Sequence, residues 1–227
     1  RKTLLGESIN ANPVYVGAPE ETYDDSPLFL HDYALFRKNN SGRNGRVYLG
    51  ASDGMLHAFD AGNGREVWAY LPAMIDFSKL ADLVRMPYVQ NAFLEGELVA
   101  ADAVAGGHWR TLLAGGLGAG GKGFFLLDVT TPDLEDVSAD RKILGEFDGS
   151  DPDLGYIHGP GSIVLMEDDV WYLVAGNGFL PESRDACLYL VPLDDISNIS
   201  PIRIRVPESE TLGLAQPAVI DSDGNGK

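Results

Sequence analysis

The residues best placed for chemistry form an acidic turn, Asp221-Ser-Asp-Gly-Asn-Gly-Lys227. Asp221, Asp223 and Asn225 stand at alternate positions, and a tight turn directs the oxygens of such positions at one centre. Hard oxygen ligands in this arrangement suit Ca²⁺, and Gly226 stands at the sixth position, where a calcium loop needs a sharp turn. Lys227 would contribute its backbone carbonyl. The sequence predicts a calcium site at these positions, with an acidic hairpin turn as the alternative. Its ninth position and closing carboxylate would fall beyond Lys227.

A glycine-rich stretch, Gly116-Leu-Gly-Ala-Gly-Gly-Lys-Gly123, matches G-x-G-x-x-G and most of the phosphate-binding G-x-x-x-x-G-K pattern. The Ser or Thr that would hold Mg²⁺ is replaced by Gly123. The residues that follow, FFLLDV, read as a strand, whereas both phosphate motifs must open a helix whose N-terminus faces the anion. We therefore interpret the stretch as a turn between strands.

A second acidic stretch holds Asp148, Asp151 and Asp153. Three carboxylates in six residues could bind a cation, but Pro152 and the neighbouring glycine favour an ordinary acidic loop.

Other reactive side chains do not combine into a centre. The four histidines fall in different parts of the chain without metal-type spacing, and no serine lies in a G-x-S-x-G context. Cys187 is the single cysteine, so an internal disulfide is excluded and we expect it to be a small buried residue. No pair of residues stands out as acid and base. The sequence predicts a protein that is not an enzyme.

Composition narrows the possible partners. The formal net charge of −17 argues against a nucleic-acid-binding face and against adhesion to anionic lipid. Apolar runs stay well short of the ~20 residues of a membrane span. Glycine (27 residues) and proline (13 residues) are plentiful, which favours short strands joined by turns.

The stretch Arg46 to Tyr70, RVYLGASDGMLHAFDAGNGREVWAY, shows which elements must position these groups. It reads as three strands separated by two tight turns, and Asp53-Gly54 favours a type I′ hairpin. Residues 55–59 alternate, with His57 on one face and Leu56 on the other. Three antiparallel strands of this kind make most of one propeller blade, which needs neighbouring blades to cover its faces.

The blade pattern recurs along the chain. Segments that begin with a leucine close to a glycine start at Leu5, Leu94, Leu154 and Leu212, and the last two intervals are 60 and 58 residues. A period near 60 in a β-rich, glycine-punctuated chain is typical of a propeller with decorated blades. Trp68, Trp109 and Trp171 recur near strand ends and indicate packing between blades.

We therefore expect an all-β fold, a partial propeller of about three blades plus the start of a fourth. Residues 1–227 would be part of a single domain with insertions between blades at about 18–45 and 73–90. The first insertion is polar and is expected to be an exposed excursion. The second (AMIDFSKLADLV, residues 73–84) has helical spacing after Pro72 and predicts the one short helix.

Two sets of motifs resemble known families. The stretch from Gly54 to Trp68 is similar to the tryptophan-docking repeat of quinoprotein propellers, through Ala58, Asp60, Asn63, Gly64 and Trp68. More specifically, VYVGA, VYLGASDGMLHAFDA, WRTLLAGGLGAGGKGFFLLDV, DLGY, VAGNGF and PAVIDSDGNGK, in this order, resemble the C-terminal domain of the PilC/PilY family of type IV pilus tip adhesins and biogenesis factors.

That resemblance implies a modified, quinoprotein-like β-propeller that acts in pilus biogenesis, extension and retraction, twitching motility, adhesion and virulence. It implies pilins and minor pilins as partners, a host-cell surface as a further one, and an extracellular location at the pilus tip or outer membrane surface. It also implies a regulatory calcium loop at Asp221, Asp223, Asn225 and the Lys227 carbonyl.

Two other readings remain open. A pyrroloquinoline-quinone dehydrogenase shares the blade repeat, although it would need a vicinal cysteine pair, and Cys187 stands alone. A purely structural propeller that serves as an envelope scaffold is the other.

Overall fold

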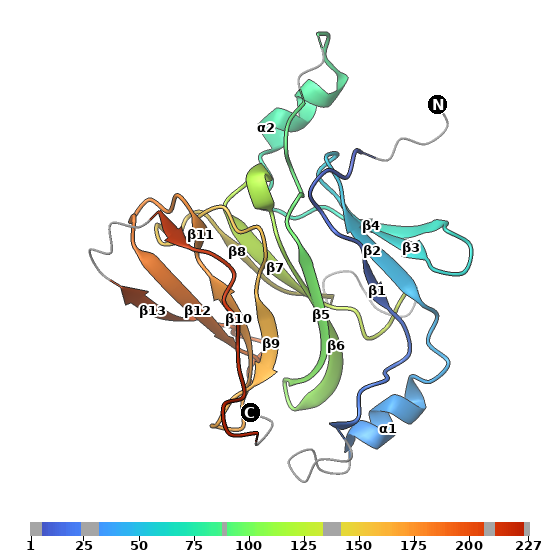
Figure 1. Cartoon of the computed structure of the whole chain (residues 1–227). Coiled ribbons are helices and arrows are strands. Elements are labelled where there is room, and N and C mark those ends of the chain that lie inside the picture. The colour runs from blue at the N-terminus through green and yellow to red at the C-terminus, as the bar shows by residue number, and fades with distance from the viewer. Residues whose placement is uncertain (1–5, 24–31, 88–89, 134–141, 207–211, 225–227) are drawn as a thin grey trace.

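The computed structural model describes residues 6–23, 32–87, 90–133, 142–206 and 212–224. Within them the chain forms three four-stranded antiparallel sheets that stand side by side without closing into a ring (Figure 1). Blade 1 consists of β1 (Val14–Val16), β2 (Arg46–Gly50), β3 (Leu56–Asp60) and β4 (Glu66–Tyr70). Blade 2 consists of β5 (Leu98–Ala105), β6 (His108–Gly116), β7 (Gly123–Asp128) and β8 (Ile143–Asp148). Blade 3 consists of β9 (Ser162–Leu165), β10 (Trp171–Gly176), β12 (Ala186–Pro192) and β13 (Ile202–Val206). The predicted partial propeller is confirmed.

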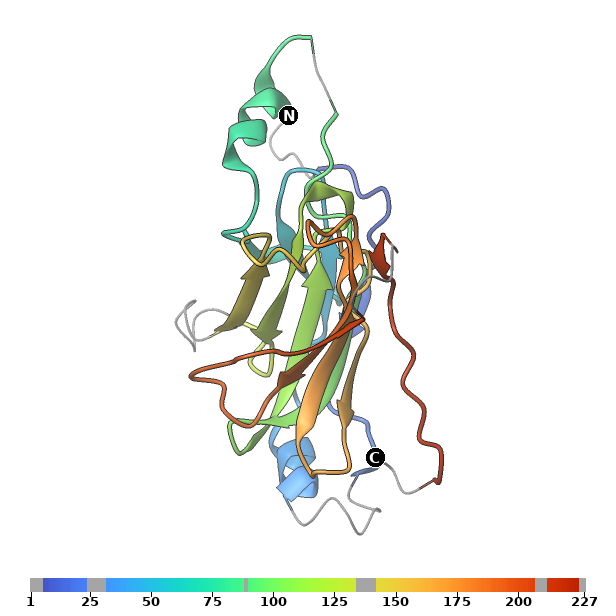
Figure 2. The ribbon, with the colours of Figure 1, turned by 90° about the vertical axis from the view of Figure 1, so that its left-hand side faces the viewer.

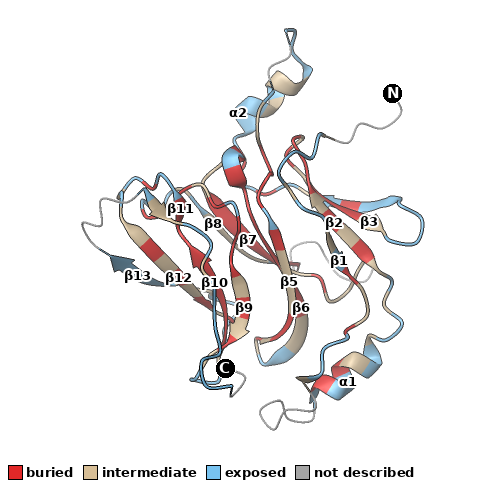
Figure 3. Cartoon of the chain, in the orientation of Figure 1, coloured by how far each residue is buried: buried red, intermediate tan, exposed pale blue. Residues whose placement is uncertain are grey.

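The middle blade is covered on both faces, which explains its unbroken apolar strands. Along β6 and β7 the side chains alternate between two cores. Leu112 and Phe124 join blade 3 residues such as Leu173 in one core, while Leu113 and Phe125 join blade 1 residues in the other. Figure 3 shows the buried residues concentrated in these central strands. The hydrophobic cores of this protein therefore lie between blades.

Each blade is also joined to the start of the next repeat. The backbone that leads into β9 crosses the end of β6, where a Cβ on Gly116 would come within 2.1 Å of the Ile157 carbonyl oxygen. At the corresponding place in blade 3, a Cβ on Gly176 would come within 2.1 Å of the Ala215 carbonyl oxygen. Only glycine permits so close an approach of two backbones. The recurring glycines of the sequence therefore mark where one repeat docks on another.

The fourth repeat is represented by this docking segment alone among the described residues. Its strand β14 (Gly213–Leu214) pairs antiparallel with β11 (Gly178–Phe179) at the end of blade 3. The rest of the described segment, residues 215–224, is without regular secondary structure and runs along one side of blade 3 (Figure 2).

The expectation of one short helix was wrong, because the described residues contain two α-helices. α2 (Phe77–Leu80) lies in the predicted place and continues into a 3-10 turn (Ala81–Val84). The other, α1 (Asp32–Asn39), lies within the first insertion, at the opposite end of the molecule (Figure 1). That insertion joins β1 to β2 inside blade 1, so the expectation that it falls between blades was wrong. Tyr33 and Phe36, one helical turn apart, are buried on the inner face of α1 against Trp109. Acidic neighbours in the sequence masked this apolar face.

The predicted type I′ hairpin was also wrong. The Gly54 N–H donates to the Ala51 carbonyl at 3.1 Å and the Ala51 N–H donates to the Met55 carbonyl at 3.1 Å, so a five-residue loop connects β2 and β3. Gly54 alone in this loop has a positive φ, of 91°. A type I′ turn would need positive φ at two successive residues.

Candidate functional site

The predicted calcium turn lies on the surface beyond β14. Asp221 and Asp223 are exposed, and the Oδ1 atom of Asp221 accepts a hydrogen bond from the Gly224 N–H at 2.7 Å. Gly224 has a φ of 73°, which bends the backbone sharply at this point. Asn225 and Lys227 lie outside the described residues. The described part of this segment, residues 221–224, is thus a turn closed by the hydrogen bond from the Gly224 N–H to the Asp221 carboxylate. Asp223 lies within this turn.

The strand that precedes the turn, β14, is attached to blade 3 through the side chain of Asn177, which is completely buried. Its Nδ2 atom donates to the carbonyls of Asp153 (2.7 Å) and Asp185 (2.9 Å), and its Oδ1 atom accepts from the N–H groups of Cys187 (3.1 Å) and Leu214 (2.8 Å). Two donated and two accepted hydrogen bonds use the full capacity of an amide. Asn177 therefore fixes β14, from which the acidic turn extends.

The donor set of this turn fits the beginning of a calcium loop. Both carboxylates are exposed, and one of them already organises the turn through a backbone N–H, as the first ligand of such a loop must. Among the residues that the structure describes, no group of three His, Cys, Asp or Glu side chains is placed to hold a metal ion. Described side chains of these four types therefore do not form a metal site by themselves.

The second acidic stretch is occupied by arginines instead. Asp151 pairs with Arg203 at 3.0 Å, and the fully buried Asp153 carboxylate pairs with Arg205 and lies 3.9 Å from Arg203. The Tyr189 hydroxyl donates to Asp151 at 2.9 Å, and burial together with this carboxylate raises the pKa of Tyr189. The interpretation of an ordinary loop missed these partners, which lie about one repeat away in the sequence.

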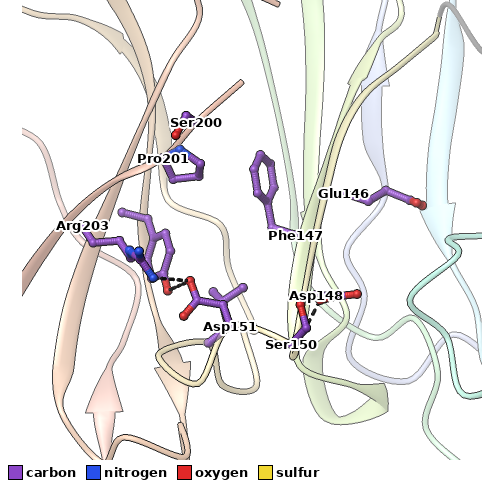
Figure 4. A pocket seen from close by; sticks show the side chains of 10 residues that line it. Glu146, Phe147, Asp148, Ser150, Asp151, Ser200, Pro201 and Arg203 are labelled. Carbon is purple, nitrogen blue, oxygen red and sulfur yellow. Dashed lines mark hydrogen bonds and ion pairs between the residues drawn. The ribbon is translucent and has the colours of Figure 1, made fainter. Parts of the chain in front are cut away.

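A slot opens beside this network between the outer strands β8 and β13 (Figure 4). Its volume is about 300 Å³. Phe147 of β8 faces Pro201, and the Asp151–Arg203 pair lies below them. Sequence reasoning did not identify Phe147, Pro201 or Arg203 as site residues. The available signal was a pair of acidic residues two apart, matched 52 residues later by a pair of arginines two apart.

One histidine lies in a charged environment that its sequence position did not reveal. The Nδ1 atom of His57 lies 2.8 Å from Glu66 Oε1, and its Nε2 atom lies 3.1 Å from both carboxylate oxygens of Asp53. Burial acts to lower the pKa of His57, but the hydrogen bonds and charges of the two carboxylates outweigh it and raise the pKa. Both nitrogens face acceptors, so the geometry fits an imidazolium that donates twice.

The other predicted groups occupy structural positions. The glycine-rich stretch is a connection between β6 and β7 with a short 3-10 turn, Gly118–Gly120, so the interpretation as a turn is confirmed. Cys187 is buried and unpaired, and burial raises its pKa to about 11. His31 lies outside the described residues.

The tryptophans pack between blades as predicted. Trp109 and Trp171, from neighbouring blades, meet edge to face at 5.8 Å. The Trp68 Nε1–H donates to the Pro132 carbonyl of the next repeat at 2.9 Å.

Comparison with known proteins places this geometry in context. The family described as the PilY1 beta-propeller domain matches residues 5–227. The type IV pilus biogenesis factor PilY1 of Pseudomonas aeruginosa strain UCBPP-PA14 is 35% identical over 232 residues, covering 100% of this chain and 19% of that protein. A PilY1 homolog from Xylella fastidiosa strain Temecula1 is 36% identical over 232 residues, covering 100% of this chain and 18% of that protein. The chain thus spans about a fifth of the length of these relatives.

A solved structure agrees with the sequence comparison. The crystal structure of the Pseudomonas aeruginosa PilY1 C-terminal domain matches with a TM-score of 0.71 and 32% identity, over 93% of this chain and 41% of that one. In the described part of our structure, no helix is both long and apolar enough to cross a membrane.

Proposed function

This chain belongs to the PilY1 β-propeller domain family, and from that membership we propose that it supports type IV pilus biogenesis as a non-enzymatic propeller domain. The observation that carries the proposal is the match over residues 5–227, together with 35% identity to a protein named as a pilus biogenesis factor. Because the chain spans about a fifth of such relatives, the role proposed is that of one domain within a longer protein.

The packing of the blades supports a scaffold role. One buried polar network centres on Asp102: Tyr33 donates to its carboxylate at 2.7 Å, and Thr111 also donates to it. Arg43 joins blade 1 to blade 2 by donating to Thr111 at 2.7 Å. Such networks hold blades in one arrangement, as a platform for other proteins requires.

Pilus assembly in cells tests the proposal. Cells that lack their own copy would receive the full-length protein, or the same protein with both Trp109→Ala and Trp171→Ala to open the core between blades 2 and 3. We expect surface pili, counted by electron microscopy, to return with the unaltered protein and with an exposed-site control, Val67→Ala, but not with the double variant. Normal pilus numbers with the whole domain deleted would refute the proposed role.

We further propose that the domain is regulated by calcium, held by Asp221, Asp223, Asn225 and the Lys227 carbonyl. The support is the turn at Asp221 and its attachment to blade 3 through Asn177 and β14. When bound, Ca²⁺ would neutralise the clustered carboxylates and order the turn. In the proposed scheme this order biases the balance of pilus extension and retraction, and hence twitching.

Calorimetric titration of the full-length protein with Ca²⁺ tests the metal proposal separately from the pilus role. We expect one binding event that is lost in Asp223→Asn and retained in Asp194→Asn, an exposed carboxylate on blade 3. Equal binding by the two variants would exclude this turn as the site. A variant that no longer binds calcium can still be tested for pilus biogenesis in the cell assay, so the two proposals are tested independently.

The partners and location follow as further parts of the proposal. Pilins and minor pilins are the proposed partners, with a host-cell surface as a further one in adhesion, and the proposed location is extracellular, at the pilus tip or outer membrane surface. Co-purification of pilins with the full-length protein from sheared pili would support both; absence of the protein from that fraction would contradict them.

A further inference from the structure

The slot between β8 and β13 has the chemistry of a small binding site distinct from the acidic turn. Its two walls come from neighbouring blades: Phe147 from blade 2 and Pro201 from blade 3 (Figure 4). Leu154 adds apolar surface, and Asp151 and Arg203 supply a hydrogen-bonding floor. Apolar walls that enclose a few convergent polar groups are a usual feature of a ligand site.

The floor is held in place and still has capacity to bind. Asp151 accepts from Tyr189, from Arg203 and from the Asp153 N–H, which uses three of about four lone-pair directions of a carboxylate. Arg203 donates through its Nη1 atom, and among the described residues no hydrogen bond involves its Nη2 or Nε atom. Its side chain is half exposed (50%), so those donors can reach a ligand.

Charge excludes most ligand classes. An anion would meet the carboxylate of Asp151, in a chain of net charge −17. A cation would meet the guanidinium of Arg203, while Glu146 and Asp148 point away from the slot (Figure 4). A wholly apolar ligand would remove water from the Asp151–Arg203 ion pair without offering hydrogen bonds in its place, which is unfavourable. A neutral ligand with apolar faces and polar edges satisfies all three constraints.

We propose that this slot binds a neutral saccharide ring between Phe147 and Pro201. The C–H face of the sugar lies on the Phe147 ring, whose face carries negative charge density. Two neighbouring hydroxyls of the sugar bind the floor of the slot: one accepts a hydrogen bond from Arg203, and the other donates to the remaining lone pair of Asp151. The planar guanidinium and the planar carboxylate lie side by side and so match two adjacent hydroxyls. The volume of about 300 Å³ is at the lower end for ligand pockets and suits one ring rather than an extended chain.

Saturation-transfer NMR on the full chain tests the proposal without any dependence on calcium. The probes are methyl β-galactoside, as a terminal sugar of surface glycans, and N-acetylglucosamine, as a sugar of bacterial cell walls; the tighter of the two identifies the source. n-Butylamine and N-acetylneuraminic acid serve as the cationic and anionic probes. We expect roughly millimolar binding of a neutral sugar, which is the range for so small a ligand.

Two substitutions locate the binding. Phe147→Leu removes the ring, and Arg203→Gln removes the charged donor from a half-exposed side chain while Arg205 stays paired with the buried Asp153. Phe147→Leu is expected to weaken neutral-sugar binding by about two- to tenfold, and Arg203→Gln by about tenfold or more, the usual worth of an aromatic contact and of a charged hydrogen bond. Phe77→Leu and Arg65→Gln, exposed residues elsewhere, are matched controls that should bind as the unaltered chain does.

Three results would overturn the proposal. They are the absence of neutral-sugar binding at tens of millimolar, unchanged binding in Arg203→Gln, and preferential binding of the amine or of the acidic sugar. Phe147 stacks on Phe124 at 4.5 Å, so thermal melting of Phe147→Leu is measured first. If that variant is unfolded, Arg203→Gln decides alone.

Discussion

Replacing His57 should remove stability in a manner that depends on pH. We predict that His57→Gln lowers the free energy of unfolding by about 1–2 kcal/mol at mildly acidic pH and by much less at alkaline pH. The estimate starts from two hydrogen bonds to charged groups, worth roughly 1.5–3 kcal/mol each. The Glu66 side chain is 48% exposed, so its bond counts as a surface pair of at most about 1 kcal/mol. Burial of the imidazolium offsets part of the Asp53 bond, leaving about 1–2 kcal/mol in total.

The sign of the pH dependence follows from the two pKa directions. The pKa of His57 is raised in the folded state, because the hydrogen bonds and charges of Asp53 and Glu66 outweigh the burial that opposes them. The stabilisation is therefore fully present below the unfolded value of about 6.5 and is lost as pH rises through the folded pKa. The pKa of Asp53 is lowered, because hydrogen bonds from His57, Gly6 and Met55 outweigh its own burial. That contribution is present above the usual Asp value of about 3.9 and is lost as pH falls through the folded pKa.

Urea unfolding at about pH 5.5 and about pH 8.5 measures the difference directly, well to either side of the usual histidine pKa. His108→Gln, at an exposed position on β6, is the matched control and should leave the difference between the two pH values unchanged. Glu66→Gln should remove only the smaller part of this stabilisation, the part contributed by the hydrogen bond between His57 and Glu66. NMR titration of the His57 ring gives its pKa independently. If His57→Gln loses the same free energy of unfolding at both pH values, or if the His57 ring titrates at or below its ordinary pKa, the two carboxylates do not stabilise the charged imidazole.

Three further predictions concern the packing of blades and of the docking segment. Asn177→Ala should cost about 3–4 kcal/mol in urea unfolding, because it removes two buried and two partly buried hydrogen bonds to the backbone; a cost below that of the exposed Asn198→Ala would contradict this. Gly116→Ala should lower the melting temperature, since its Cβ would lie 2.1 Å from the Ile157 carbonyl oxygen and overpacking of this kind costs roughly 1–3 kcal/mol; an unchanged melting temperature would show that the backbones separate freely. Cys187, buried and with its pKa raised to about 11, should react with a thiol reagent at neutral pH only in step with unfolding, and rapid labelling of the native protein would count against its burial.

The blades could be predicted because their signals are local. Alternation along residues 55–59, glycines at strand ends and recurring tryptophans each act over a few residues, and all three reflect contacts that the structure contains. α1 was missed because its two buried aromatic residues pack on Trp109, which lies on blade 2 and far away in the sequence. The turn at Asp53-Gly54 was misassigned because an Asp-Gly pair indicates a turn but does not determine how many residues the loop between the two strands contains.

The slot could not be predicted residue by residue, because its walls belong to two repeats. Its charged floor nevertheless has a pattern. Asp151 and Asp153 stand two apart, as do Arg203 and Arg205, and each acid meets an arginine 52 residues later. Arg203 and Arg205, two apart on β13, share a face, and Asp151 and Asp153 lie in the connection between β8 and β9, where both meet that face. Charges of opposite sign that share a spacing of two and a common offset along the chain therefore indicate a contact between a connection and a later strand, where single motifs predict only turns.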